Sequence, residues 1–452
     1  MHGTGTGLKA LAADLAAKRT TARELLARSV AAHDPALNAY KLWAPDFAQR
    51  QAEAADAAFA AGIVAGPLQG IPVSVKDLYG IAGLPIFAGS PRALPEAWQR
   101  EGPVVGRLRR QLPVVVGKTH TVEFAFGGLG ANCHWPVPWN PRDRKVHRAP
   151  GGSSSGAGVS LVEGTALLAF GTDTAGSVRI PASVTGTVGL KTTWGRWSTD
   201  GIVPLSPSLD TAGILTRSVA DAAFAFAALD GGAAVPALDS LLGCRVGVAR
   251  SFFFDDLSSG VGESVEAALG VLDKAGARVS DFTMLGLAEL HAIYAHGGIV
   301  APELYRFLRR ELPDWLETLD PRVKRRIDAG KTLEAWEYLD RKAAYAAQGK
   351  ATVEALRTVD VLVTPTVPIT APLMAEVDDD SRYSALNMQV LRNTSMVSFL
   401  GLCALTLPIG TDAAGMPVGL QLIAPPFGEA KLLAIAETFE RAFAKAGLWS
   451  QE

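Results

Sequence analysis

Gly151-Gly152-Ser153-Ser154-Ser155-Gly156 is the first of two segments that set this sequence apart, and the second is Gly171-Thr172-Asp173-Thr174-Ala175-Gly176-Ser177-Val178-Arg179-Ile180-Pro181-Ala182. Both are dense in glycine, serine and threonine. A flexible linker has a similar composition, but it lacks apolar stretches such as those at residues 159–168 and 184–190. We therefore predict that residues 129–225 are folded, and that the glycines meet requirements of the backbone.

Outward from this region, short apolar runs alternate with longer helical patterns. Apolar runs bounded by glycine and proline predict strands at residues 70–77, 112–118, 245–249, 359–364, 404–408 and 418–424. Helical patterns cover residues 8–33, 45–62, 219–229, 262–276, 332–358 and 428–446, and residues 286–345 indicate an added helical layer. The alternation predicts an α/β fold with a central mixed, largely parallel sheet covered by helices on both faces.

The composition excludes several functional classes. The 452 residues are 48% apolar and 19% charged, which is typical of a large folded core rather than a disordered chain. The net charge of −2 argues against a nucleic acid partner, because phosphate binding needs a basic excess. Basic runs at residues 142–145 and 322–326 are short, and we interpret both as solvated faces.

The cysteines and histidines predict no metal site and no disulfide framework. Cys133, Cys244 and Cys403 are far apart, and we expect them to be buried free thiols in a reducing cytoplasm. No secretory signal opens the sequence, and no stretch approaches the roughly 18 apolar residues of a membrane span. A cytoplasmic protein without metal or other cofactor, and without a membrane partner, is therefore expected.

Together, the two opening segments closely resemble the signature of the amidase signature family. Gly189-Leu190-Lys191 and Ser208-Leu209-Asp210 are similar to two further family segments, and Val75-Lys76-Asp77 holds the upstream lysine. The resemblance covers most of the chain and is strongest over residues 70–225. It implies one amidase signature domain over residues 1–452, with a variable helical layer at about 286–345 that contributes to the substrate pocket.

The resemblance implies a catalytic triad. The family's nucleophile corresponds to Ser177, its bridging serine on a cis peptide bond to Ser153, and its lysine to Lys76. The chemistry fits these residue types, because a serine hydroxyl is a weak nucleophile until a base removes its proton. Lysine acts as a base only when burial or nearby positive charge lowers its pKa, and Lys76 follows an apolar run.

The second segment is expected to stabilise the negative charge that develops on the substrate oxygen. The resemblance implies oxyanion donors in the backbone N–H groups of Thr174, Ala175, Gly176 and Ser177. Removing one such donor typically lowers the rate by about 10²–10³. Asp173 and Arg179 flank the nucleophile, and we interpret them as residues that position the loop.

Three alternatives stay open at this point. Gly152-Ser153-Ser154-Ser155-Gly156 also satisfies the GxSxG pattern of α/β-hydrolases, with Ser154 as nucleophile, but polar residues 142–150 precede it where that pattern needs a strand. The chain could instead be the glutaminase component of a tRNA-dependent amidotransferase, which shares the signature. A catalytically inactive binding module is the third alternative, although the chain retains all three triad residues.

The substrate is expected to be a small molecule that contains an amide, and the chain is expected to form a homodimer, as relatives often do. Phe126, Gly127, Gly128 and Tyr305 are candidate pocket residues. Glu303, Tyr305, Arg309 and Arg310 could bind a substrate that bears a carboxylate. An outward-facing helix with salt bridges would explain the same four residues.

Overall fold

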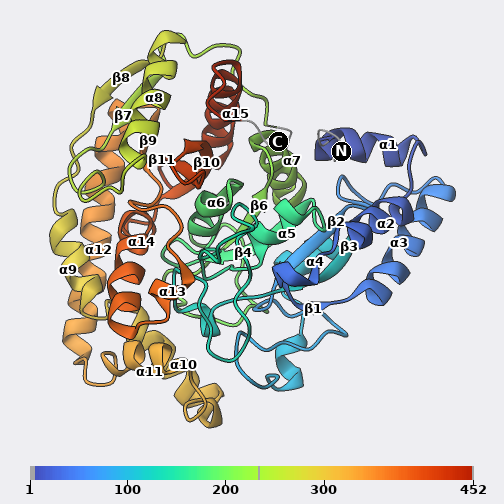
Figure 1. Ribbon diagram of the computed structural model, residues 1–452, viewed down its shortest axis with the longest axis horizontal. Helices are drawn as coiled ribbons and strands as arrows, with labels where there is room; N and C mark the ends of the chain where they lie inside the picture. The colour runs from blue at the N-terminus through green and yellow to red at the C-terminus, as the bar shows by residue number, and fades with distance from the viewer. Residues whose placement is uncertain (1–5, 233–234, 450–452) are drawn as a thin grey trace.

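The computed structural model describes residues 6–232 and 235–449, which are built around one mixed sheet of eleven strands (Figure 1). The strands are β1 Tyr40–Trp43, β2 Pro72–Lys76, β3 Val114–Thr119, β4 Leu168–Asp173, β5 Val188–Lys191, β6 Thr211–Thr216, β7 Arg245–Val248, β8 Arg278–Asp281, β9 Val361–Pro365, β10 Cys403–Thr411 and β11 Pro417–Ala424. Across the sheet they follow the order β1-β3-β2-β4-β6-β5-β10-β11-β9-β7-β8.

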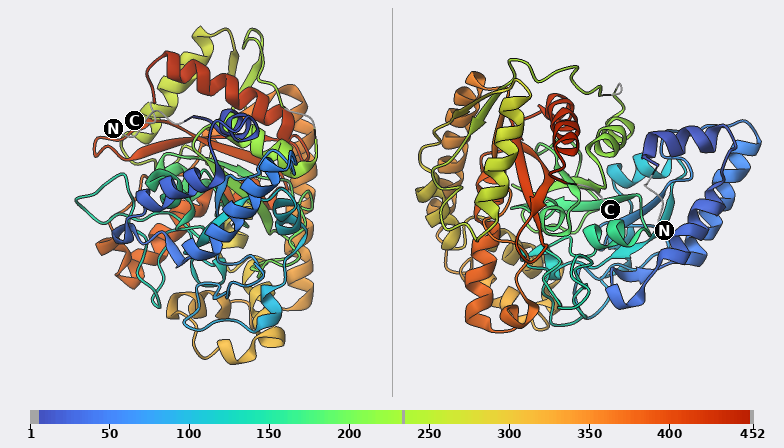
Figure 2. Two further views of the ribbon diagram at one scale, coloured as in Figure 1. Left: turned by 90° about the vertical axis from the view of Figure 1, so that its right-hand side faces the viewer. Right: turned by 45° about the horizontal axis from the view of Figure 1, so that its top comes forward.

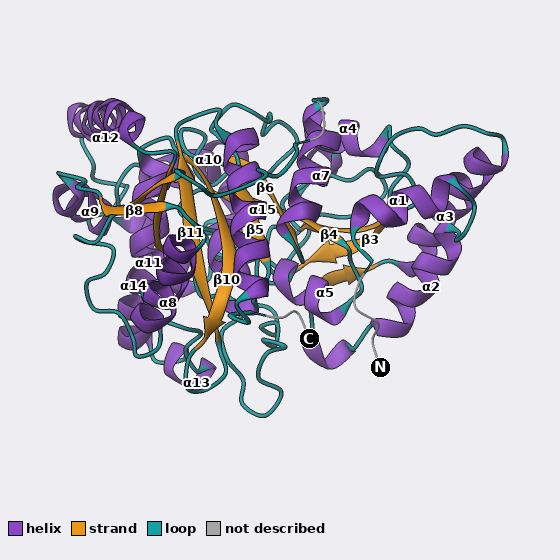
Figure 3. Cartoon of the chain, turned by 90° about the horizontal axis from the view of Figure 1, so that it is seen from above, coloured by secondary structure: helices purple, strands orange, loops and turns teal. Residues whose placement is uncertain are grey.

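Helices flank the sheet along its whole width (Figures 1 and 2). They are α1 Leu8–Ala16, α2 Ala22–Ala32, α3 Pro45–Ala60, α4 Pro103–Arg109, α5 Ala157–Glu163, α6 Arg179–Thr185, α7 Val219–Asp230, α8 Val261–Lys274, α9 Leu287–Ala295, α10 Val300–Glu311, α11 Pro321–Asp328, α12 Ala335–Ala355, α13 Met374–Val377, α14 Asp380–Phe399 and α15 Glu429–Lys445. Helices α2 and α3 lie at one end of the molecule, and α9 and α12 lie at the other (Figure 3).

The predicted α/β fold and mixed sheet are confirmed, but parallel pairing does not dominate. Among the described residues, six strand pairs are antiparallel and four are parallel. Antiparallel neighbours such as β10 and β11 are joined by a tight turn, whereas parallel neighbours need a longer crossover. The central strands are buried along their length, which explains why their sequences are continuous apolar runs rather than alternating ones.

The single helix predicted over residues 8–33 is wrong, because two helices occupy this stretch. The second, α2, begins after Thr21, whose side chain accepts a hydrogen bond from the Glu24 N–H, while the Glu24 carboxylate accepts one from the Thr21 N–H. This reciprocal pair is a capping box, which satisfies backbone donors at a helix start. The Thr-x-x-Glu spacing is visible in the sequence and is the local signal for the break.

Residues 286–345 are helical, as predicted. They form α9, α10, α11 and the start of α12. Helices α10 and α11 pack against each other below the sheet in Figure 1.

Cys133 is exposed, Cys244 is half-buried and Cys403 is buried, so the expectation of three buried thiols is wrong for Cys133. Within the described ranges, no group of three His, Cys, Asp or Glu side chains is arranged to hold a metal ion. No helix in the same part of the chain is both long enough and apolar enough to cross a membrane.

The first glycine-serine segment is held close to β1 and β3. The Gly156 N–H donates to the His120 carbonyl at 3.1 Å, and the His120 N–H donates to the Ala39 carbonyl at 3.0 Å. A methyl group on Gly156 would lie 1.9 Å from the Ala39 carbonyl oxygen. Only glycine therefore fits at this position.

We predict that Gly156→Ala strongly destabilises the protein, because the added methyl group meets backbone atoms that cannot rotate away. Gly270→Ala is the control: this glycine lies in α8 with no atom within 4 Å of the added methyl group, and alanine favours a helix by up to about 1 kcal/mol. Thermal unfolding of both variants measures the difference. Equal melting temperatures for the two variants would contradict the close approach of Gly156 to the Ala39 carbonyl oxygen.

Candidate active site

Lys76 and Thr172 meet near the carboxyl ends of two neighbouring strands, β2 and β4. β2 and β4 are parallel neighbours, with Val75 opposite Phe170, so their carboxyl ends lie side by side. Lys76, the last residue of β2, is fully buried. Its Nζ donates to the Ser153 Oγ at 2.8 Å and to the Thr172 Oγ1 at 2.8 Å.

Burial controls the protonation of Lys76. It lowers the pKa of the ammonium group to about 7, although the negative charges of Asp173 and Asp210 act in the opposite direction. An ordinary lysine has a pKa near 10.4 and is almost fully charged at neutral pH. Lys76 can therefore exist as a neutral amine, the form that accepts a proton.

Ser153 and Ser177 come from the two glycine-rich segments. The Gly152–Ser153 peptide bond is cis, as the resemblance implied, and Ser153 is fully buried. The segments are joined by a hydrogen bond of 3.3 Å from the Ser154 N–H to the Ser177 carbonyl. Ser177 is 3% exposed and lines a narrow cavity. Among the described residues, no hydrogen bond joins the Ser177 hydroxyl to the Ser153 hydroxyl.

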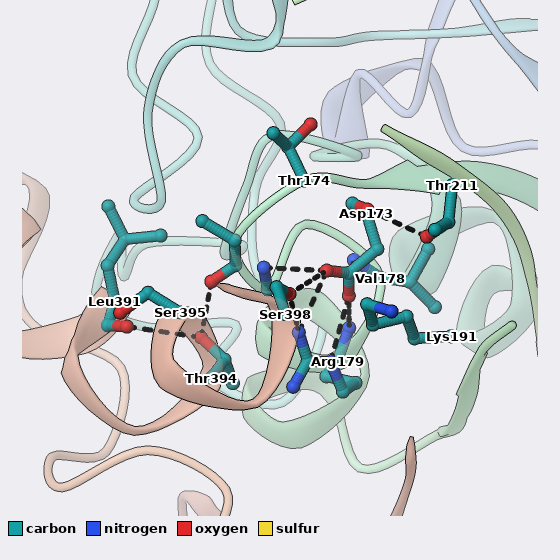
Figure 4. A network of polar contacts seen from close by, with 12 residues as sticks. Asp173, Thr174, Val178, Arg179, Lys191, Thr211, Leu391, Thr394, Ser395 and Ser398 are labelled. Atoms are coloured by element: carbon teal, nitrogen blue, oxygen red, sulfur yellow. Dashed lines mark hydrogen bonds and ion pairs between the residues drawn. The ribbon is translucent and has the colours of Figure 1, made fainter. Parts of the chain in front are cut away.

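The Ser177 loop is held by a buried ion pair (Figure 4). Arg179 Nη2 lies 2.8 Å from the Asp173 Oδ1, Arg179 Nε lies 3.0 Å from the Oδ2, and both side chains are completely buried. Burial by itself would raise the pKa of Asp173, but Arg179 and Lys191 lower it to about 2. Asp173 is therefore a carboxylate at neutral pH, and its position agrees with the predicted role in orienting the loop.

The Gly176 N–H is not available as an oxyanion donor, so this prediction is wrong. It donates to the Asp173 Oδ1 at 2.7 Å, and Gly176 does not line the cavity. The other three predicted residues, Thr174, Ala175 and Ser177, all line the cavity. The sequence showed four consecutive small residues but not the direction of each N–H group.

Residues far away in the sequence complete the support of this loop. The Thr394 hydroxyl, on α14, donates to the Ala175 carbonyl at 2.7 Å, and the Ser398 hydroxyl accepts from Arg179 at 2.7 Å (Figure 4). The Thr174 hydroxyl donates to the buried Asp210 carboxylate at 2.6 Å. Burial raises the pKa of Asp210 to about 7. The sequence carries no local signal that would assign Thr394 or Ser398 to the site.

Two cavities with shared lining residues lie on this side of the molecule, and Ser177 lines the narrower one. The narrow one is lined by Ala125, Phe126, Gly127, Thr174, Ala175, Ser177, Leu205, Tyr294, Val300, Arg326 and Leu391. The larger has a volume of about 230 Å³ and shares Phe126, Tyr294 and Arg326 with the narrow one. The shared residues place the two cavities next to each other, and of the two only the narrow one is lined by Ser177.

The cavities contain only part of the predicted pocket. Phe126 lines both and Gly127 lines one, whereas the Gly128 N–H donates to the Asn387 Oδ1 at 2.8 Å and Gly128 lines neither. Tyr305 also lies outside the lining, half-buried against the core, with the Lys331 Nζ 5.5 Å from its ring centre. Its assignment to the pocket is therefore wrong.

The predicted carboxylate-binding group on α10 is also wrong. Glu303 accepts hydrogen bonds from the Ser206 hydroxyl, the Ser208 N–H and the Tyr338 hydroxyl, so it joins α10 to its neighbours. Arg309 and Arg310 are exposed and line neither cavity, which fits the outward-facing helix.

The basic run at residues 322–326, interpreted from the sequence as solvated, is solvated only in part, because Lys324 and Arg325 are exposed whereas Arg322 and Arg326 are half-buried. Arg322, Arg325 and Arg326 line the larger cavity. All three belong to α11, and their spacing in the sequence is compatible with a shared helix face. The spacing does not indicate what that face contacts.

The α/β-hydrolase alternative does not fit the structure. Residues 142–150 form turns and loop rather than the strand that precedes a nucleophile elbow. Ser154 is completely buried, and its hydroxyl lies 3.5 Å from the Thr172 carbonyl. Ser154 lines neither of the two cavities.

Comparison with known proteins agrees with the geometry. The Amidase family model matches residues 21–433. The chain belongs to the amidase family. It is a hydrolase that acts on carbon–nitrogen bonds in small molecules.

Several relatives match nearly the whole chain. It is 52% identical to a 2-amino-5-chloromuconic acid deaminase of Comamonas testosteroni, over 96% of each chain. It is 32% identical to a glutamyl-tRNA(Gln) amidotransferase component from Geobacter sp. (strain M21), over 91% of each. A crystal structure of an amidase superposes with a TM-score of 0.87 at 32% identity, covering 98% of this chain and 100% of the other.

We predict that Arg179→Met costs about 3–5 kcal/mol of unfolding free energy at neutral pH, because Asp173 becomes an unpaired buried charge. The lowered pKa of Asp173 stabilises the wild type above the unfolded pKa, and this contribution disappears as the pH falls toward about 2. In the variant the carboxyl is protonated at higher pH. The difference between variant and wild type should therefore shrink as the pH falls.

Guanidinium unfolding at pH 7 and pH 4 measures this difference. The double variant Asp173→Asn, Arg179→Met is the control, and it should lose less stability at pH 7 than Arg179→Met alone. An equal loss at both pH values would show that an unpaired Asp173 charge is not the cause.

Proposed function

We propose that the chain hydrolyses a small amide through an acyl-enzyme on Ser177, with Ser153 as proton relay and Lys76 as base. The observation that carries this proposal is the hydrogen bond of 2.8 Å between the Lys76 Nζ and the Ser153 Oγ, in a fully buried setting. Burial lowers the pKa of Lys76 to about 7, close to the value best suited to a general base at neutral pH.

In the proposed reaction, the Ser177 Oγ attacks the amide carbonyl carbon and its proton passes through Ser153 to neutral Lys76. The carbonyl oxygen becomes an oxyanion near the N–H groups of Thr174, Ala175 and Ser177. When the carbon–nitrogen bond breaks, the proton returns through Ser153 to the leaving nitrogen, so ammonia or an amine departs. Water then attacks the ester with Lys76 again as base, releasing a carboxylic acid and free Ser177.

The size of the larger cavity favours a small substrate. This cavity, at about 230 Å³, is below the roughly 300–1,000 Å³ of sites for drug-sized ligands. The chain is 52% identical to a deaminase of an amino-substituted acid and 32% identical to the amidotransferase component, which favours action on a small molecule over the role of a glutaminase component. Retention of Lys76, Ser153 and Ser177 argues against an inactive binding module. A cytoplasmic homodimer stays a prediction from the sequence.

We predict that a fluorophosphonate forms one covalent adduct with the purified protein, on Ser177. Ser177→Ala should abolish the adduct, and Ser153→Ala or Lys76→Ala should slow its formation by at least about 10²-fold, because the nucleophile loses its base. Ser154→Ala is the matched control and should label at the wild-type rate. Intact mass and peptide mapping measure the result, and an adduct on any other residue would contradict the proposed nucleophile.

We also predict that labelling accelerates as the pH rises, with a midpoint near 7, because only neutral Lys76 accepts the proton. Below the midpoint, the rate should fall about tenfold per pH unit, following the neutral fraction of one titrating group. Labelling rates between pH 5 and pH 9 test this profile.

Asp210 is the necessary control, because its pKa is also raised to about 7. In Asp210→Asn the profile should persist with a slightly lower midpoint, since one of the two negative charges that raise the pKa of Lys76 has been removed and that of Asp173 stays. Loss of the pH dependence in this variant would assign the titration to Asp210 and contradict the role of Lys76.

A further inference from the structure

Helix α11 directs a basic face toward the larger cavity. Arg322, Arg325 and Arg326 line it, and their i, i+3 and i+4 spacing places them on one side of the helix. The other lining residues are apolar or uncharged, among them Phe126 and Tyr294. The lining formed by the described residues thus contains three cationic side chains and no carboxylate.

Two of the three arginines already have an acidic partner. The Arg325 Nη2 lies 2.7 Å from the Asp380 Oδ2, and the Arg322 Nε lies 3.4 Å from the Asp380 Oδ1. One carboxylate therefore faces two guanidinium groups and neutralises only one of their charges.

Arg326 has no carboxylate within ion-pair distance among the described residues, although it is half-buried. Its Nη1 donates to the Phe126 carbonyl at 2.8 Å, its Nη2 lies 3.4 Å from the Tyr294 hydroxyl, and its guanidinium carbon lies 3.8 Å from the centre of the Phe126 ring. These contacts fix the guanidinium without cancelling its charge. Arg326 is also the one arginine that lines both cavities in the described part of the chain.

The start of α11 is tied to the segment that carries Phe126. The Asp320 N–H donates to the buried Glu123 Oε2 at 2.6 Å, and the Asp320 carboxylate accepts from the Arg322 N–H at 2.8 Å and the Cys133 N–H at 2.9 Å. Arg326 and Phe126 are therefore held as one unit. A guanidinium fixed in advance loses little conformational freedom when it binds an anion.

We propose that Arg326 binds a carboxylate of the substrate, at the end remote from the bond that is cleaved. The substrate class is then a short acid that carries both a carboxylate and the amide, with its carbon chain against Phe126 and Tyr294. Guanidinium is suited to this task because its planar N–H groups match the two oxygens of a carboxylate. This inference rests on the proposed attack by Ser177, which requires the amide carbonyl to lie beside the Ser177 hydroxyl.

The test measures binding to the Ser177→Ala variant by calorimetry, so that the amides are not consumed. The probes are succinamate, glutaramate and adipamate, each compared with the neutral amide of the same chain length: butanamide, pentanamide and hexanamide. At least one acid amide should bind ten or more times more tightly than its neutral counterpart. Adding Arg326→Gln to this variant should weaken the binding of the acid amide far more than the binding of the neutral amide. The preference for the acid amide should therefore disappear.

Lys324→Gln is the matched control, because Lys324 is an exposed cation on the same helix and lines neither cavity. It should keep the preference, and Arg326→Lys should keep part of it, because the charge stays but the planar group is lost. Measurable binding of the neutral amide and a cooperative thermal transition show that Arg326→Gln is folded.

Equal binding of acid and neutral amides at all three lengths would overturn the inference, and so would a preference that survives Arg326→Gln. Fluorophosphonate labelling of the wild-type Ser177 reports separately on the proposed function. An adduct on Ser177 without a preference for acid amides leaves the hydrolase mechanism standing and removes only the carboxylate site. A preference for acid amides without an adduct on Ser177 leaves the carboxylate site standing and contradicts the hydrolase mechanism.

Discussion

The buried ion pair between Asp173 and Arg179 holds the candidate active site together. Two charges in a solvent-free interior are costly unless each is paired and hydrogen-bonded, and this pair is fully partnered. Asp173 ends β4 and accepts the N–H groups of Gly176 and Val178. Arg179 begins α6 and bonds Gln421 on β11 and Ser398 on α14. The pair therefore fixes the Ser177 loop against two distant parts of the chain, β11 and α14.

The same low-dielectric interior gives Lys76 its chemistry. A lysine at the end of a buried strand cannot keep its charge as easily as one in water, so its pKa falls toward neutrality. Ser153 and Thr172 supply hydrogen bonds but no negative charge, so they hold the amine without restoring the ordinary pKa. The parallel pairing of β2 with β4 brings Lys76 to this position.

In the proposed mechanism, different parts of the chain supply reactivity and recognition. Lys76, Ser153 and Ser177 belong to β2 and to the glycine-rich segments near the sheet, whereas the larger cavity is lined by α9, α11 and α14. Phe126 and Arg326 lie at the junction of the two regions. Substitutions in the helical layer could therefore change the preferred substrate without altering the geometry around Lys76.

The amino-acid sequence predicted the α/β class and six of the eleven described strands, because apolar runs bounded by glycine and proline are local signals. The resemblance to the amidase signature implied Lys76, Ser153 and Ser177, and in the folded chain Lys76 contacts Ser153 and also Thr172, which was not predicted. The strand pairing, the engaged N–H of Gly176, and the lining of the cavity by Arg326 instead of Arg309 emerge only in the folded chain. These features depend on contacts between residues far apart in the sequence. A basic run looks the same in a sequence whether it faces water or a cavity, since neighbouring elements supply its surroundings.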